Sequence, residues 1–229
     1  MLSRPDTAAA AGHQEERLFL VIALALAAIA AAGCWLAAAA LARKDAARGI
    51  PPDHPRQLAD FSLTDRTGRT VTRAELDGQV LAVSFLFTGC ATTCPEVSRQ
   101  MSEIQRLTAG EPDVRLVSFT VDPRSDTPAV LAKWGAHYSA DTNRWLLLTG
   151  RQPALEELLA TSFLSQGTND PFNSMPGNFT GTERIALVDK QGRVRVYYDG
   201  LRPGTPAAVV AEMERLRREK PSANPNHIQ

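Results

Sequence analysis

The 229-residue sequence predicts an α/β fold, a mixed sheet with helices on both faces, preceded by one transmembrane helix. Two observations indicate the α/β domain: apolar runs of strand length alternate with helical patterns, and the last two strand patterns form a hairpin. A third observation indicates the membrane span. Residues 18–42 carry no charge, and about 20 apolar residues are enough to cross a bilayer as a helix.

Three segments are predicted before the domain. Residues 1–17 form an N-terminal tail, residues 18–42 the transmembrane helix, and residues 43–57 a polar tether with three prolines. The span is too long and too late in the chain for a typical cleaved signal peptide, but AAGC, which ends at Cys34, resembles a lipoprotein cleavage box. Lipoprotein processing at Cys34 therefore stands as the alternative to a retained anchor, and the flanking charges do not decide the orientation.

The domain is predicted over residues 58–219, followed by a polar tail at 220–229. Continuous apolar runs, such as VLAVSFLF at 80–87, indicate strands that are covered on both faces of a sheet. Helices are indicated by apolar stripes and by start signals, such as Pro95 in a first turn. The predicted elements are a hairpin around 64–68, a helical turn at 73–77, a strand at 80–87, a helix from Thr93 or Cys94 whose stripe ends at Leu107, a strand at 114–121, a helix at 128–138 capped by Asp126 or Thr127, a strand at 144–150, a helix at 153–163, a hairpin of 184–189 and 193–200, and a helix at 205–218.

This order of elements suits a thioredoxin-like fold. Residues 165–182 follow neither a helical nor a strand period, and a stretch of that length usually marks a functional loop. The chain has 25 Lys and Arg residues and 25 Asp and Glu residues, which gives a net charge of zero. Because no basic field is present to attract phosphate backbones, we predict no nucleic-acid partner.

Cys90 and Cys94 are the only cysteines after the span, and they lie between a strand pattern and a helix pattern. A disulfide between them would enclose too short a loop to act mainly as a staple, which indicates a chemical role. The start of a helix lowers the pKa of a nearby thiol, and a spacing of four permits either a disulfide or shared binding of a soft ion such as Cu(I) or Zn(II). The alternative is a pair of inert core cysteines.

The segments FSLTDRTGRTVTRAELDGQVLAVSFLFTGCATTCPEVSRQM, SFTVDPRSDTPAVLAKW, LLLTG and RIALVDKQGRVRVYYDG together resemble the Sco/SenC family of membrane-anchored, thioredoxin-like copper proteins. The resemblance runs from about Leu58 to Leu216 and includes the preceding single span. It implies an extracytoplasmic or periplasmic domain on the inner (cytoplasmic) membrane, with Cu(I) on Cys90 and Cys94. It also implies a copper-delivery or redox function in assembling cytochrome c oxidase, whose subunit or another copper or thiol protein would be the partner.

One departure from the family concerns its third copper ligand, a histidine that falls at Gly181 here. Two thiolates alone suffice for soft Cu(I), whereas Cu(II) would lose the imidazole that suits it. Met175 and Met101 offer thioethers, although Met101 is expected to fill the core. Three histidines are poor replacements for the missing ligand because of where they lie: His13 precedes the span, His54 is in the tether, and His137 is expected on a helix surface.

Two carboxylates near the cysteines have two interpretations each. Asp122 either approaches the thiols or only forms an Asp-Pro turn, and Glu96 mainly stabilises the helix start but is close enough to exchange protons. The order of thiol attack stays open, with Cys90 favoured if it is the more exposed. The resemblance favours a copper chaperone and assembly factor over an enzyme; a metal-free thiol-disulfide oxidoreductase and a non-catalytic assembly scaffold remain as alternatives.

Overall fold

The computed structural model describes residues 22–34, 49–52, 56–163 and 183–219 of a chain that divides into two units, Met1–Asp45 and Ala46–Gln229. In the first unit, residues 22–34 are helical. No helix in the part of the chain that the structure describes is long and apolar enough to cross a membrane. Several predicted segments lie outside the described residues: the tail 1–17, the ends of the span at 18–21 and 35–42, most of the tether, the 165–182 loop and the tail 220–229.

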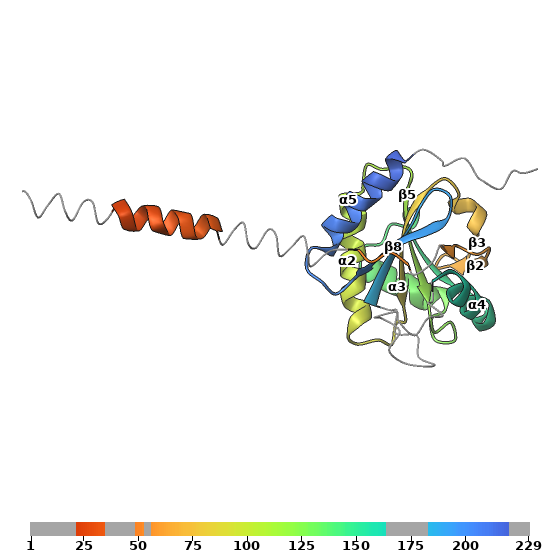
Figure 1. The fold of residues 1–229 in the computed structure, drawn as a ribbon. Helices are drawn as coiled ribbons and strands as arrows, with labels where there is room; N and C mark the ends of the chain where they lie inside the picture. Colours follow the sequence, from red (N-terminus) through yellow and green to blue (C-terminus); the bar gives the residue numbers. More distant parts are fainter. Residues whose placement is uncertain (1–21, 35–48, 53–55, 164–182, 220–229) are drawn as a thin grey trace, which may run out of the picture. The chain divides into compact units, whose positions relative to one another are not determined.

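The second unit is built on an eight-stranded sheet (Figure 1). Its strands are β1 (Arg56–Gln57), β2 (Ser62–Asp65), β3 (Thr70–Thr72), β4 (Val80–Leu86), β5 (Val114–Thr120), β6 (Trp145–Thr149), β7 (Arg184–Val188) and β8 (Arg193–Asp199). They follow the order β1-β8-β7-β4-β5-β6-β2-β3 across the sheet. Strands β4, β5 and β6 are parallel to one another, and the other neighbours are antiparallel. The predicted mixed sheet is therefore confirmed.

Helices cover both faces of this sheet, as predicted. Because successive strand residues point to opposite faces, Val80, Ala82 and Leu86 of β4 pack in one hydrophobic cluster and its alternate residues pack in the other. The first cluster includes side chains of α2 (Thr93–Leu107), α3 (Pro128–His137) and α5 (Thr205–Arg218). The second includes side chains of α4 (Gln152–Ser162) and of the 3-10 helix η1 (Arg73–Leu76).

Two details differ from the sequence-based expectation. Strand β1 pairs with β8, and Ile50 forms a bridge with Tyr197, so the sheet extends into the segment predicted as the tether. Leu107 was expected in the apolar stripe of α2 but is 42% exposed, because the buried face continues from Ile104 to Thr108 instead. Of the two predicted caps of α3, the structure has Thr127: its hydroxyl accepts a hydrogen bond from the Val130 N–H, whereas Asp126 makes other contacts.

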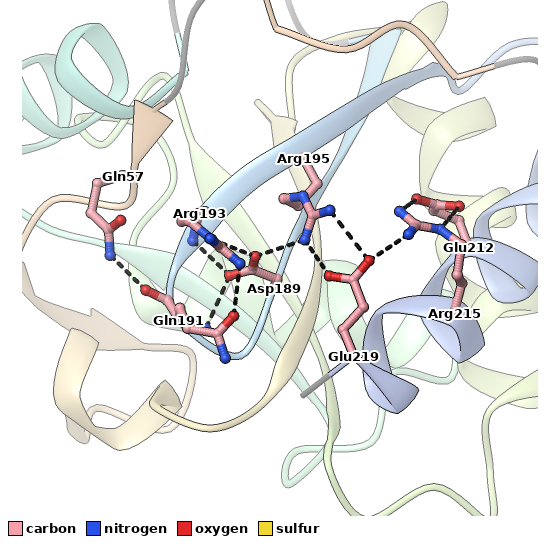
Figure 2. A network of polar contacts seen from close by, with 8 residues as sticks. All are labelled: Gln57, Asp189, Gln191, Arg193, Arg195, Glu212, Arg215 and Glu219. Atoms are coloured by element: carbon pink, nitrogen blue, oxygen red, sulfur yellow. Dashed lines mark hydrogen bonds and ion pairs between the residues drawn. The ribbon is translucent and has the colours of Figure 1, made fainter. Parts of the chain in front are cut away.

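A polar network ties the β7–β8 turn to the end of α5 (Figure 2). The carboxylate of Asp189 is buried and accepts hydrogen bonds from Nε of Arg193 at 2.8 Å and Nη1 of Arg195 at 2.9 Å. Arg195 also pairs with Glu219 at 2.7 Å. The sheet register places Val188, at the end of β7, opposite Leu81, near the start of β4. The network therefore lies at the opposite end of the sheet from the turn that carries the cysteines.

Candidate thiol site

Cys90 lies in the turn between β4 and α2, and Cys94 is the second residue of α2. Neither is in a disulfide in the described structure. The backbone N–H of Cys94 donates to the sulfur of Cys90 over 3.4 Å. Within the described residues, the side chain of the N-cap Thr92 accepts no N–H group of the helix, so the Cys90 sulfur satisfies one of the helix's open donors.

The pKa of Cys90 is lowered to about 6. Partial burial raises this pKa, but hydrogen bonds to the sulfur from the Thr93 hydroxyl at 3.4 Å and from the backbone N–H groups of Cys94 and Thr92 outweigh it. Cys90 is half-buried and its neighbours Gly89 and Ala91 are exposed, so a reaction partner can reach it. Cys90 is therefore a thiolate at neutral pH, the form that attacks disulfides and binds metals.

Cys94 has the opposite character. Its side chain is fully buried in the cluster beneath α2, beside Val97 and Met101. Burial raises its pKa, the neighbouring Cys90 sulfur adds to this effect, and hydrogen bonds from the Phe87 backbone and the Thr93 side chain only partly oppose it, so the pKa lies at about 11. Cys94 is therefore protonated at neutral pH. The pair combines an accessible thiolate with a buried thiol, which makes Cys90 the group that reacts first.

The structure also places a buried carboxylate beside the cysteine turn. Asp126 is fully buried; it accepts hydrogen bonds from the Thr88 N–H at 3.1 Å, the Thr88 hydroxyl at 2.6 Å and the Thr120 hydroxyl. The sequence interpretation treated Asp126 only as a helix cap. A signal for this other role was present in the sequence: Asp126 directly precedes Thr127 and Pro128, a typical cap and first helical residue. Because Thr127 fills the cap, the Asp126 side chain is left to bind another partner.

Glu96 has structural contacts, and the backbone of Asp122 forms the predicted turn. Glu96 forms an ion pair with Arg99 and accepts a hydrogen bond from Gln100 at 3.0 Å; these contacts lower its pKa and hold it along the helix surface. The backbone carbonyl of Asp122 accepts the N–H groups of Ser125 and Asp126, which is the geometry of a turn.

The sequence-predicted substitutes for the missing histidine divide into two groups. Met101 is fully buried in the core, and His137 is exposed at the end of α3 with its ring 4.8 Å from that of Tyr138. Gly181, Met175, His13 and His54 lie outside the described residues. Over the described ranges, no three His, Cys, Asp or Glu residues come together as a metal site. The ligands found here for a soft ion are therefore the two sulfurs.

Comparisons with known proteins give one consistent result. A family model described as SCO1/SenC matches residues 51–218. The SCO1 protein homolog of Bacillus subtilis is 31% identical over 152 residues, which is 63% of this chain and 79% of that protein. The structure of BsSco, a Sco-family cytochrome c oxidase assembly protein with a disulfide switch, is similar with 27% identity and a TM-score of 0.61, covering 75% of this chain and 99% of that chain.

A copper-bound relative is similar as well. The structure of Bradyrhizobium japonicum ScoI with copper bound shares 25% identity and a TM-score of 0.54, covering 69% of this chain and 98% of that chain. The curated SCO2-like protein of Rickettsia felis is 33% identical over 108 residues, which span 47% of this chain and 51% of that protein.

Proposed function

Because the chain belongs to the SCO1/SenC family, we propose that it acts in cytochrome c oxidase assembly as a carrier of Cu(I), held by Cys90 and Cys94. One observation carries this proposal: two sulfurs meet at one helix start, and one of them is already a thiolate at neutral pH. Thiolates select soft ions such as Cu(I). Copper is thus the cargo, and its recipient is an oxidase subunit or another copper protein.

The two pKa values predict the proton balance of copper binding. Cys90 has lost its proton above about pH 6, and Cys94 keeps its proton up to about pH 11. Binding of Cu(I) to both sulfurs at pH 8 therefore releases about one proton, from Cys94, because a ligating thiol must be deprotonated. A pair of ordinary thiols would release nearly two.

A competition experiment tests the carrier. The full chain with Cys34→Ser, which leaves only the two candidate thiols, is reduced and titrated without oxygen with Cu(I) against a chromogenic chelator. We expect one Cu(I) per chain and release of about one proton at pH 8, measured in weakly buffered solution with a pH dye. Cys90→Ser and Cys94→Ser in this background should each lose the copper. Retention of copper by the double serine variant, or no retention by the parent, would refute the carrier.

A second candidate function, thiol-disulfide exchange, is favoured by the unequal pKa values of the two cysteines. The Cys90 thiolate would attack a disulfide of a partner protein, forming a mixed disulfide and releasing one partner thiolate. Cys94 would then lose its proton and attack the Cys90 sulfur, releasing the second partner sulfur. The net result is oxidation of this pair to a disulfide and reduction of the partner. Reduction of an oxidase copper-site disulfide by the metal-free protein, with no Cu(I) retained, would select this candidate.

We further propose that residues 18–42 anchor the protein in the inner (cytoplasmic) membrane, with the domain in the periplasm. The support is the uncharged length of this segment. Labelling Cys90 in spheroplasts with a membrane-impermeant maleimide, in the Cys34→Ser background, tests the location; labelling only after lysis would refute it.

A mass that corresponds to acylated Cys34 at a new N-terminus would indicate lipoprotein processing. Full oxidase assembly with the Cys90→Ser/Cys94→Ser variant would indicate a scaffold.

A further inference from the structure

Asp126 is a fully buried carboxylate that the proposed chemistry does not use. It comes from the loop between β5 and α3, and it reaches residues on two different strand ends. On the β4 side, the backbone N–H of Thr88 donates to both carboxylate oxygens of Asp126, at 3.1 and 3.3 Å. The Thr88 hydroxyl donates to the same carboxylate at 2.6 Å. From the β5 side it receives the Thr120 hydroxyl. A buried carboxylate that is satisfied by several donors fixes the groups around it firmly.

The peptide bond between Phe87 and Thr88 connects this carboxylate to the backbone of Cys90. Its N–H, which belongs to Thr88, is held by Asp126. Its carbonyl, which belongs to Phe87, accepts the N–H of Cys90 at 3.1 Å. A rotation of this one peptide would therefore break both the contact with Asp126 and the backbone contact that fixes Cys90 in the turn.

We propose that Asp126 is a positioning residue that, through Thr88, holds the cysteine turn so that the Cys90 sulfur stays against its donors at the start of α2. The proposal rests on the function proposed above, since it assigns how the reactive geometry of that same pair is maintained. Asp126 acts by holding geometry and not by its charge. A negative charge beside the turn would disfavour a thiolate, so any benefit must come from the hydrogen bonds.

Two threonines on the same carboxylate give a matched test. Thr88→Val removes a hydroxyl donor to Asp126 on the cysteine side and keeps both the shape and the charge of the site. Thr120→Val removes a donor to the same carboxylate on the β5 side and also the acceptor of the Asp122 N–H, so it costs at least as many hydrogen bonds without releasing the cysteine side. Thr88→Ser restores the hydroxyl. All variants are made in the full-length Cys34→Ser chain.

The measurement is the second-order rate constant of Cys90 alkylation by iodoacetamide at pH 6.5, well below the denaturation midpoint of each variant. We expect Thr88→Val to react about five- to tenfold more slowly, which is the effect of one ordinary hydrogen bond. Thr88→Ser and Thr120→Val should stay within about twofold of the parent. An unchanged rate in Thr88→Val, or an equal loss in Thr120→Val, would overturn the proposal. Alkylation needs neither copper nor a partner, so failure of the carrier function would leave this result standing, and the reverse also holds.

Discussion

The hydroxyl of Thr93, 3.4 Å from the Cys90 sulfur, is expected to contribute about one unit to the lowered pKa of that thiol. The Cys90 pKa lies about three units below its usual 9.0. This corresponds to at most about 4 kcal/mol, and to less where water reaches the half-buried sulfur. Four hydrogen bonds to the Cys90 sulfur together produce this lowering and also offset the cost of burial; they come from the Thr93 hydroxyl, the backbone N–H groups of Thr92 and Cys94, and the Cys94 thiol. Each is therefore worth about 1 kcal/mol, and Thr93→Val, which keeps the shape of the side chain, should raise the pKa to about 7.

The assay is the rate of Cys90 alkylation as a function of pH in the reduced Cys34→Ser chain. At pH 5.5 the thiolate fraction of Thr93→Val should be about eightfold lower than that of the parent, and the two rates should converge above pH 8.5. Thr92→Val is the control, because its hydroxyl lies 3.9 Å from the same sulfur, too far for a comparable hydrogen bond. Overlapping profiles for Thr93→Val and the parent, or equal shifts in both variants, would refute the reasoning.

With oxidised glutathione, Cys94→Ser in the Cys34→Ser background should accumulate a mixed disulfide at Cys90 and release one reduced glutathione, visible by mass spectrometry, because the resolving sulfur is gone; equally fast adduct formation at Cys94 in Cys90→Ser would contradict the assigned order of attack. In the reduced protein, the free energy of unfolding should rise from pH 6 to pH 9, because Cys90 has a lower pKa in the folded state, and fall from pH 9 to pH 11, because Cys94 has a higher one. Urea denaturation checks this, and Cys90→Ser should lose the rise. Gly135→Ala should cost about 1–3 kcal/mol in the same assay. The Cβ that this substitution adds would lie 1.8 Å from Nη1 of the buried Arg66, and Arg66 cannot easily move away because its Nη2 donates a hydrogen bond to the Ala140 carbonyl. An unchanged denaturation midpoint would contradict this expected cost.

The alternating strands and helices were predictable because their signals are local. A run such as VLAVSFLF is apolar at every position only where both faces of a strand are covered, and the structure buries all of β4. Strand β1 carries no such signal: it has only two residues, Arg56 and Gln57, and pairs with β8 more than 130 residues later. Its pairing depends on the completed sheet, so no local pattern indicates it.

The candidate site shows the same division. The strand-to-helix position of Cys90 and Cys94 followed from their neighbours in the sequence, and with it the expectation of a lowered thiol pKa. Their unequal burial did not follow, because it depends on which side of the helix start faces the core. The contact between Asp126 and Thr88 crosses 38 positions of the chain, and an Asp before a helix start predicts a cap equally well.

The Cys90 sulfur that closes the start of α2 also affects how readily the pair gives up electrons. As an anion it is stabilised by the donors around it, and a disulfide sulfur, which carries no charge, loses that stabilisation. A reduced form that is favoured in this way makes its disulfide the stronger oxidant and its dithiol the weaker reductant. The pair is thus inclined to stay reduced, which suits the proposed Cu(I) carrier more than the proposed reductant of partner disulfides.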